Sequence, residues 1–403
     1  MAVAQGIEKQ VKIVEQSALG TAGSTGSQLF RRVTTTFNLD RDTYTSNEIV
    51  DHQQSTGATA GVAKTSGALN GELSPGTYQK LFDNLLRKAW AATTPITALS
   101  VTIAGSGPTY TITRSSGWWT DGIKVGDIIR LSVGTLNAAN ISKNLLITGL
   151  TQTVATVVPL NGVALVAEGP ITGCTVTVTG KKVWVPASSH LNKYLSVEEW
   201  HSGLSKSELF TDVKVASAAL TLPATGIATV NFDMPGLGRT RGTSEVLTSP
   251  TAASTSTILT AVQGKVVVDG TVTSITGAQL TITGNIQPGE AEVGSNAISD
   301  HQRGRVGVSG SFTAKFSSTT LQTLFDAQTA ASLVLVVADS ASATAEFVTF
   351  VMSNVKIFSD NADDGEKEII RTYNFTAAYN GSGHATTAAH LPTIISIQDS
   401  LAA

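Results

Sequence analysis

The sequence predicts a mainly-β protein with two tandem β-sandwich or β-barrel domains, each flanked by one α-helix, and a small all-β domain inserted in the first. Only 14% of the 403 residues are charged, whereas an average soluble protein has roughly 25%. The chain is rich in Thr, Ser and Gly, which favour strands and turns. Segments of the first half also recur in the second, and an internal repeat sets the architecture of a chain.

The clearest repeat is an eight-residue motif. Ser46–Gln53 reads SNEIVDHQ and Ser295–Gln302 reads SNAISDHQ, so six of the eight positions are identical. Two further pairs of segments line up in the same order: Gly67–Ser74 with Gly310–Ser317, and Thr229–Phe232 with Thr372–Phe375. The sequence therefore predicts two domains of common origin.

The two copies differ in length by about a hundred residues between their second and third matching segments. A difference of this size predicts an inserted domain, because a hundred residues is an ordinary domain length. The predicted boundaries are 28–92 with 191–235 for the first domain, 93–190 for the insert, 236–263 for a linker and 264–385 for the second domain. Residues 1–27 and 386–403 are predicted to be terminal arms, because they are small and polar.

Each copy contains one predicted helix. In the first copy, Ser74 is a candidate N-cap and Pro75 suits the first helical position. Apolar residues from Tyr78 to Ala89 then recur with the period of an α-helix. In the second copy, the weaker pattern over 318–331 predicts a shorter helix.

Charge and cysteine content exclude several classes of protein. The net charge of −3 argues against tight DNA binding, which needs a basic surface to neutralise phosphates. The only cysteine, Cys174, cannot form an intramolecular disulfide. The first residues include Glu8 and Lys9 instead of an apolar leader, and the longest apolar run, Ala331–Ala338, is too short to span a membrane. We therefore expect a soluble protein made in the cytoplasm, with no membrane partner.

No residue pattern predicts catalysis, a cofactor or a metal site. The six histidines form no HExxH motif and no pair with metal-ligand spacing. The pairs Asp51–His52 and Asp300–His301 occupy equivalent places in the two copies, and a structural hydrogen bond or an interface contact explains them best. We therefore expect a building block and not an enzyme.

Four segments of the first copy carry a family resemblance. Ser46–Ile49, the run from Gly67 to Tyr78 with the helix after it, Phe30–Val33 and Thr229–Phe232 resemble the tail tube proteins of long-tailed bacteriophages with flexible, non-contractile tails. The resemblance implies a β-sandwich or barrel with a flanking helix, assembled so that strands of six units close a barrel around a channel. Rings would stack into the tail tube of the virion, through which genome DNA and the tape measure protein pass.

The duplication modifies this expectation, because two copies in each chain favour a ring of three chains with pseudo-sixfold symmetry; the sequence leaves a ring of six chains as the open alternative. The resemblance further implies contacts with the tail terminator and distal tail proteins, with DNA only as passing cargo. A neutral or acidic wall would release DNA easily, and the candidate lumen or interface residues are Asp51, His52, Glu208, Asp212, Asp233, Asp300 and His301. The insert would block a channel, so we expect it on the tube exterior.

Two other classes remain open at this level. An extracellular adhesin or carbohydrate-binding array of β-domains would share the composition, but it would need a secretion signal. An enzyme would need titratable groups that converge in a pocket.

Overall fold

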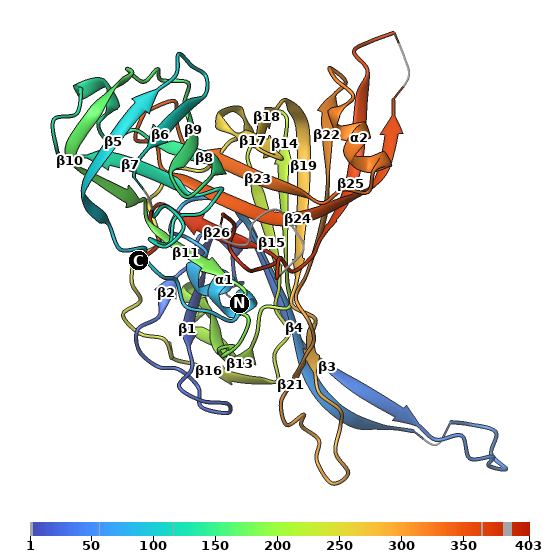
Figure 1. Ribbon diagram of the computed structural model, residues 1–403. Helices are drawn as coiled ribbons and strands as arrows, with labels where there is room; N and C mark the ends of the chain where they lie inside the picture. Colours follow the sequence, from blue (N-terminus) through green and yellow to red (C-terminus); the bar gives the residue numbers. More distant parts are fainter. Residues whose placement is uncertain (1–2, 56, 116, 364–365, 382–388) are drawn as a thin grey trace.

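The computed structural model describes residues 3–55, 57–115, 117–363, 366–381 and 389–403. Strands dominate these residues, together with two α-helices, α1 (Gln79–Leu86) and α2 (Thr320–Asp326). The predicted mainly-β class is confirmed. Figure 1 shows a body of packed sheets, a separate barrel at the upper left and a long two-stranded arm at the lower right.

A 13-stranded sheet forms the centre of the molecule. Its continuous path runs β18-β17-β23-β24-β25-β22-β19-β14-β15-β4-β3, and β26 joins it beside β24 and carries β11. The strands of the second half are β17 (Lys265–Val268), β18 (Thr271–Thr273), β19 (Ile275–Thr283), β22 (Gly307–Lys315), β23 (Ala331–Ala338), β24 (Phe347–Ala362) and β25 (Ile370–Ala377). The others are β3 (Thr34–Thr45), β4 (Ala58–Glu72), β11 (Lys181–Trp184), β14 (Ser217–Pro223), β15 (Thr229–Asp233) and β26 (Ser396–Asp399).

A second sheet of five strands has the order β16-β13-β12-β1-β2. These strands are β1 (Lys9–Glu15), β2 (Gln28–Leu29), β12 (Leu195–His201), β13 (Lys206–Val213) and β16 (Gly238–Gly242). A short hairpin of β20 (Ile286–Pro288) and β21 (His301–Arg303) stands apart from both sheets.

The two halves of the chain have the same strand order. The second half reads β18-β17-β23-β24-β25-β22-β19, and the first half reads β2-β1-β12-β13 followed by β14-β15-β4-β3. The difference is that β24 is one long strand where the first half has two, β13 and β14. The first half breaks at residues 214–216, just after Asp212, which has a left-handed φ of 56° near the end of β13. Each α-helix follows the equivalent strand, β4 or β22.

Six strands form a closed barrel in the order β10-β5-β6-β9-β8-β7. They are β5 (Ile96–Ala104), β6 (Tyr110–Thr113), β7 (Ile128–Ser132), β8 (Leu145–Leu150), β9 (Val154–Pro159) and β10 (Glu168–Val178). The barrel has its own apolar core, in which Trp118 is fully buried and Trp119 is partly buried. These residues lie within the predicted insert.

Polar contacts fasten the barrel to the central sheet. The Lys182 Nζ on β11 lies 2.8 and 3.0 Å from the two carboxylate oxygens of Asp127, beside β7, and both side chains are buried. On β26, the Gln398 side chain accepts from the Ile128 amide and donates to the carbonyl oxygens of Ile128 and Thr179. The barrel is therefore held by a buried ion pair and by the C-terminal strand, together with an apolar contact between Ile128, Leu146 and Leu160 and the strands β17, β23 and β24.

Helix α1 begins later than predicted. Gly76 has a φ of 73°, which no α-helix accommodates, so Ser74 to Thr77 form a turn in which the two hydroxyl groups lie 2.6 Å apart. The helix covers the apolar face of the sheet, where Phe82 packs edge-on against Phe232. The apolar spacing therefore indicated the buried face of α1 but not its first residue.

Three segments predicted to be arms or linker contain strands of the body. Residues 1–27 include β1, whose Val11 and Ile13 are buried between β12 and β2. Residues 236–263 include β16, an edge strand with the sequence GRTRG that pairs with β13. Main-chain hydrogen bonds hold such a strand without an apolar signal. Of residues 386–403, the described part from 389 includes β26.

Candidate functional site: an uncharged sheet face and its two free edges

Eight neighbouring strands of the central sheet, β24-β25-β22-β19-β14-β15-β4-β3, bury one face and leave the other open. Leu69, Leu220 and Phe232 point into the core from the buried face, where α1 packs. Successive side chains of a strand point to opposite faces, so the cross-strand register identifies the residues of the open face. We call this surface the open face.

The open face consists mainly of Ser, Thr, Asn and Gln side chains. One row crosses all eight strands without a break in register and reads Lys356, Thr376, Ser309, Thr281, Ala219, Asn231, Asn70, Thr34. The next row reads Asn374, Ser311, Gln279, Thr221, Thr229, Glu72. A row of this kind is wettable but carries almost no fixed charge.

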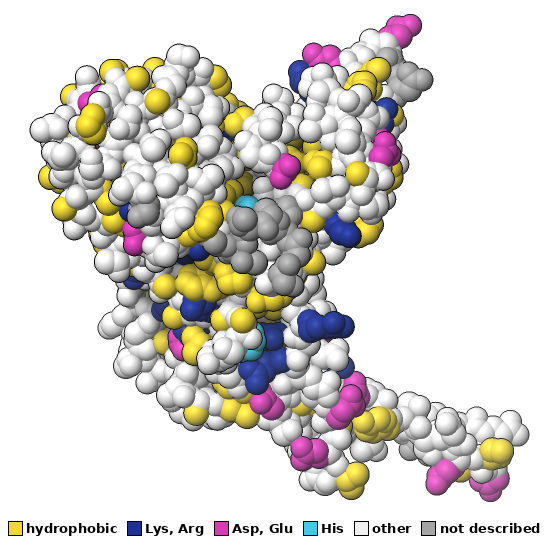
Figure 2. Space-filling model, viewed as in Figure 1, with side chains coloured by type: hydrophobic (Ala, Val, Ile, Leu, Met, Phe, Trp, Pro, Cys, Tyr) yellow, Lys and Arg dark blue, Asp and Glu magenta, His cyan; other side chains and the backbone are white. Residues whose placement is uncertain are grey.

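Charged side chains on the open face are few and of both signs. Among the described residues they are Asp40, Lys64, Glu72, Asp233, Lys315 and Lys356. Lys315 is paired with Glu368 at 2.6 Å. The face is thus close to neutral. Figure 2 shows the molecule from the side on which α1 lies, where uncharged side chains cover most of the surface in view and several Lys and Arg side chains lie near the centre.

Both ends of this eight-stranded segment have free main-chain edges. In the part of the chain that the structure describes, β3 pairs with β4 alone, and residues 356–362 of β24 pair with β25 alone. In the middle of the segment, β14 of the first half pairs antiparallel with β19 of the second over seven residues. By position in the strand order, β3 corresponds to β19, and the C-terminal part of β24 corresponds to β14.

The loop from β19 to β22, residues 284–306, folds back onto the first half. The His301 Nε2 lies 2.6 Å from the Asp212 carbonyl oxygen, and the Tyr194 hydroxyl donates to the Asp300 carboxylate at 2.9 Å. The Lys214 Nζ lies 3.9 Å from the centre of the Tyr194 ring. Burial lowers the pKa of Lys214 to about 8 and also lowers the pKa of His301. The loop and the first half thus meet in a largely buried polar contact, which we call the polar junction.

The predicted site residues are dispersed over the molecule. Asp233 lies on the open face, whereas Asp212 is buried near the end of β13. Glu208 lies on β13 in the other sheet, 2.8 Å from the Arg241 Nε, so it does not belong to the open face. The sequence indicated the strand that carries Glu208, but it did not indicate which sheet that strand joins.

The histidine pairs differ sharply between the copies. Asp300 and His301 are held in the polar junction, whereas Asp51 and His52 are exposed on the arm of β3 and β4. The uncharged residues of the open face were not among the site residues predicted from the sequence. Their signal was the alternation in segments such as Leu280-Thr281-Ile282-Thr283, where a buried residue alternates with a polar one.

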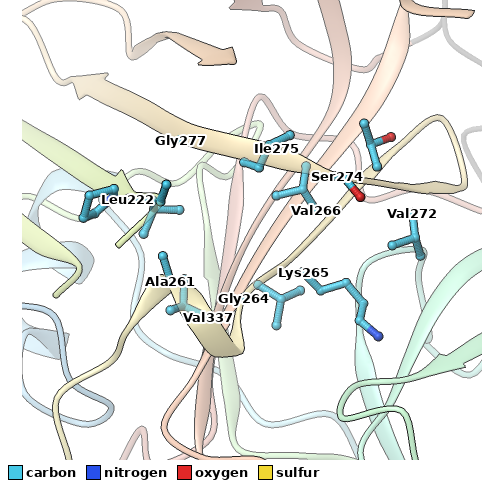
Figure 3. A pocket seen from close by; sticks show the side chains of 14 residues that line it. Leu222, Ala261, Gly264, Lys265, Val266, Val272, Ser274, Ile275, Gly277 and Val337 are labelled. Atoms are coloured by element: carbon cyan, nitrogen blue, oxygen red, sulfur yellow. The ribbon is translucent and has the colours of Figure 1, made fainter. Parts of the chain in front are cut away.

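The cavities of the described residues show no catalytic arrangement. The one in Figure 3 has a volume of about 280 Å³ and lies between the β17–β18 hairpin, β23 and the ends of β14 and β19. Its lining is mostly apolar, and the Lys265 ammonium donates to the Pro159 carbonyl oxygen. The described residues contain no cluster of His, Cys, Asp and Glu able to hold a metal ion, and none of their helices is long and apolar enough to cross a membrane.

The fold and the open face define a structural β-protein whose distinctive surfaces are a neutral wall and two unpaired sheet edges. A family model described as phage tail tube protein matches residues 6–377. The chain therefore belongs to the phage tail tube protein family and is a structural component of the virion tail. No curated protein matches it.

Proposed function

We propose that this chain polymerises into closed rings that stack to form the tail tube, and that the open face lines the channel for genome DNA during ejection. The observation that carries the proposal is the pair of free edges on a sheet whose two halves share one strand order. Exposed sheet edges invite pairing with another chain, and closure removes them.

The junction of β14 with β19 provides the geometry for closure. In the ring, β3 of one chain pairs antiparallel with residues 356–362 of β24 in the next chain, as β19 pairs with β14 within the chain. Eight strands from each of three chains give a barrel of 24 strands. With strands about 4.8 Å apart and tilted by about 40°, the backbone diameter is about 48 Å. Such a barrel encloses a wide aqueous channel.

The neutral wall suits a conduit for DNA. Each Lys or Arg that neutralises a phosphate releases counterions and adds salt-dependent affinity, which would retard DNA that must move. The rows of Ser, Thr, Asn and Gln supply a wettable surface without this attraction. Duplication of one ancestral tube domain explains the common strand order of the halves. The tape measure, tail terminator and distal tail proteins are the expected partners of the channel and its ends.

Electron microscopy of the purified protein tests the proposal. Hollow tubes with regular striations are the expected result, whereas monomers under all conditions would exclude a tube-forming protein. Hydrogen exchange then tests which edges close the ring. The outward-facing amides of β3 and of residues 356–362 should gain protection on assembly, and unchanged exchange in assembled tubes would refute this closure.

We also propose that the barrel of β5 to β10 decorates the outside of the tube. Ala91 and Lys182 exchange two main-chain hydrogen bonds of 2.8 and 2.9 Å, so a short linker can replace residues 96–178 without moving the ends. The deletion removes Asp127, so Lys182→Met should accompany it to avoid an unpaired buried charge. Tubes of smaller outer diameter are expected, and loss of assembly by a folded deletion variant would contradict the peripheral position.

A further inference from the structure

The two free edges of the open face carry side chains of opposite charge. Asp40 is exposed on β3, where its carboxylate accepts a hydrogen bond from the Ser66 hydroxyl at 2.9 Å. The lysine opposite it on β4, Lys64, lies instead 4.0 Å from a carboxylate oxygen of Asp42. Lys356 is exposed on β24 at the other edge. Neither Asp40 nor Lys356 has an ion pair within the part of the chain that the structure describes.

The register of the sheet gives Asp40 an equivalent in the junction of β14 with β19. The aligned segments of β4 and β22 begin at Gly67 and Gly310. Asp40 of β3 pairs with the residue three positions before Gly67, and Thr283 of β19 pairs with the residue three positions before Gly310. Asp40 and Thr283 therefore occupy the same place in the two halves.

The register also gives Lys356 an equivalent on β14. The aligned segments on this side are Thr229–Phe232 of β15 and Thr372–Phe375 of β25. Ser217 of β14 and Lys356 of β24 each pair with the residue that directly follows the aligned segment. The bulge of β24 at Phe358 lies beyond this position and leaves the correspondence unchanged.

These two equivalences predict which residues meet where β3 of one chain pairs with β24 of the next in the proposed ring, a contact that we call the ring joint. Within the chain, Ser217 of β14 lies directly opposite Thr283 of β19. The same register at the ring joint places Lys356 of one chain directly opposite Asp40 of the next. Both side chains project from the open face, so they share one side of the joined sheet.

The adjacent pair of residues supports this register. Leu39 is half-buried and Ile357 is buried, and in this register they lie opposite each other on the buried face. The equivalent pair within the chain, Ala218 with Ile282, is likewise apolar and buried. A slip by one residue would place Asp40 opposite Ile357 and bring side chains to the wrong faces. Apolar alternation and charge therefore favour the same alignment.

We propose that Asp40 of one chain and Lys356 of the next form an ion pair that fixes the register of the ring joint. The inference rests on the proposed ring and adds the residues that align its chains. Cross-strand pairs of opposite charge stabilise a sheet, and the equivalent pair within the chain, Ser217 with Thr283, carries no charge. The ion pair also neutralises Lys356, the single cation of its row on the open face, which would otherwise attract phosphates.

Disulfide formation tests the register directly. In the double variant Asp40→Cys with Lys356→Cys, directly opposite residues have Cα atoms about 4.5–5.5 Å apart, which a disulfide can bridge. The matched control is Asn38→Cys with Lys356→Cys, because Asn38 is exposed on the same face of β3 but diagonal neighbours are about 7–8 Å apart. The native Cys174 is buried. Mild oxidation of assembled tubes should give disulfide-linked dimers and trimers with the first pair and none with the control.

Charge reversal provides the second measurement. Asp40→Lys and Lys356→Asp should each raise the protein concentration needed for half-maximal assembly by about fivefold, because like charges directly opposite each other destabilise a sheet. The double variant should assemble at a lower concentration than either single variant. The control Thr283→Lys changes the equivalent position within the chain, where it faces the uncharged Ser217, and should leave the concentration unchanged.

The outcomes separate this ion pair from the tube function. Wild-type tubes that form while the Asn38→Cys pair cross-links and the Asp40→Cys pair does not would overturn the register and leave the tube standing. A double charge variant that assembles no better than the single variants would overturn the ion pair in the same way. A wild-type chain that never assembles would overturn both proposals.

Discussion

Breaking the buried ion pair between Lys182 and Asp127 should destabilise the attachment of the barrel. The Lys182 Nζ donates to both Asp127 oxygens, and Asp127 also accepts from the Lys124 amide at 2.8 Å. Lys182→Met therefore removes the charged donor to both oxygens of a buried carboxylate, while the hydrogen bond from the Lys124 amide remains. Removal of one partner of a buried pair costs about 3–5 kcal/mol, which is the expected loss in free energy of unfolding.

The double variant Asp127→Asn with Lys182→Met separates charge from packing. It removes both charges, so its stability should lie within about 2 kcal/mol of wild type. The neighbouring Lys181→Met is the matched control, because Lys181 is half-exposed and has no ion pair with the described residues. It should stay within about 0.5 kcal/mol of wild type.

Denaturant unfolding of the unassembled chain, followed by tryptophan fluorescence, measures these differences. Trp118 is fully buried in the barrel core and reports its unfolding. Two results would refute the reasoning: a single variant as stable as Lys181→Met, or a double variant no more stable than the single one. The first would mean that the pair carries no net interaction, and the second that packing and not charge holds the barrel.

Three other predictions concern the core, the titration of the C-terminal strand and the open face. Phe232→Ala should cost about 3–5 kcal/mol in unfolding free energy, because Phe232 is fully buried beneath α1. The control Thr229→Ala, on the opposite face of β15, should cost less than about 0.5 kcal/mol. Equal losses for the two variants would contradict the assignment of faces. Burial raises the pKa of Asp399 to about 6, so the folded chain binds a proton that the unfolded chain releases. The stability that this bound proton contributes is fully present below about pH 4 and disappears as the pH rises through about 6. Acidification from pH 7 to 4.5 should therefore stabilise wild type by about 2 kcal/mol relative to Asp399→Asn. Denaturant midpoints at the two pH values measure this difference, and identical pH profiles of the two proteins would contradict it. Thr281→Lys should leave folding and tube assembly intact but slow DNA ejection from virions, with recovery at higher salt; an unchanged ejection rate would argue against a channel position for this residue.

Local patterns in the sequence predicted the features that depend on near neighbours. The apolar spacing from Tyr78 to Ala89 indicated the buried face of α1, and the weaker pattern over 318–331 indicated α2. Low charge and abundant Thr predicted the mainly-β class, which the structure confirms. The family followed from short motifs in and beside these strands and is shown by the match over residues 6–377.

The strands that the sequence did not indicate lie in segments whose pairing partners are distant in sequence. The sequence of β16, GRTRG, carries no apolar signal, and its place beside β13 depends on main-chain hydrogen bonds that any residue except proline can make. β1 pairs with β12, nearly two hundred residues further along the chain. The terminal strand β26 is likewise enclosed between β11 and β24.

By itself, the sequence determined the class of fold, the helices and the repeated motif, because these depend on side-chain periodicity and identity. Only the tertiary structure decided that Thr281, Asn231 and their neighbours share one open face while Glu208 lies in another sheet. The physical reason is that alternation places a side chain on one of two faces, but strand pairing decides which strands make that face. The same pairing buries His301 and leaves His52 exposed, although their motifs are nearly identical.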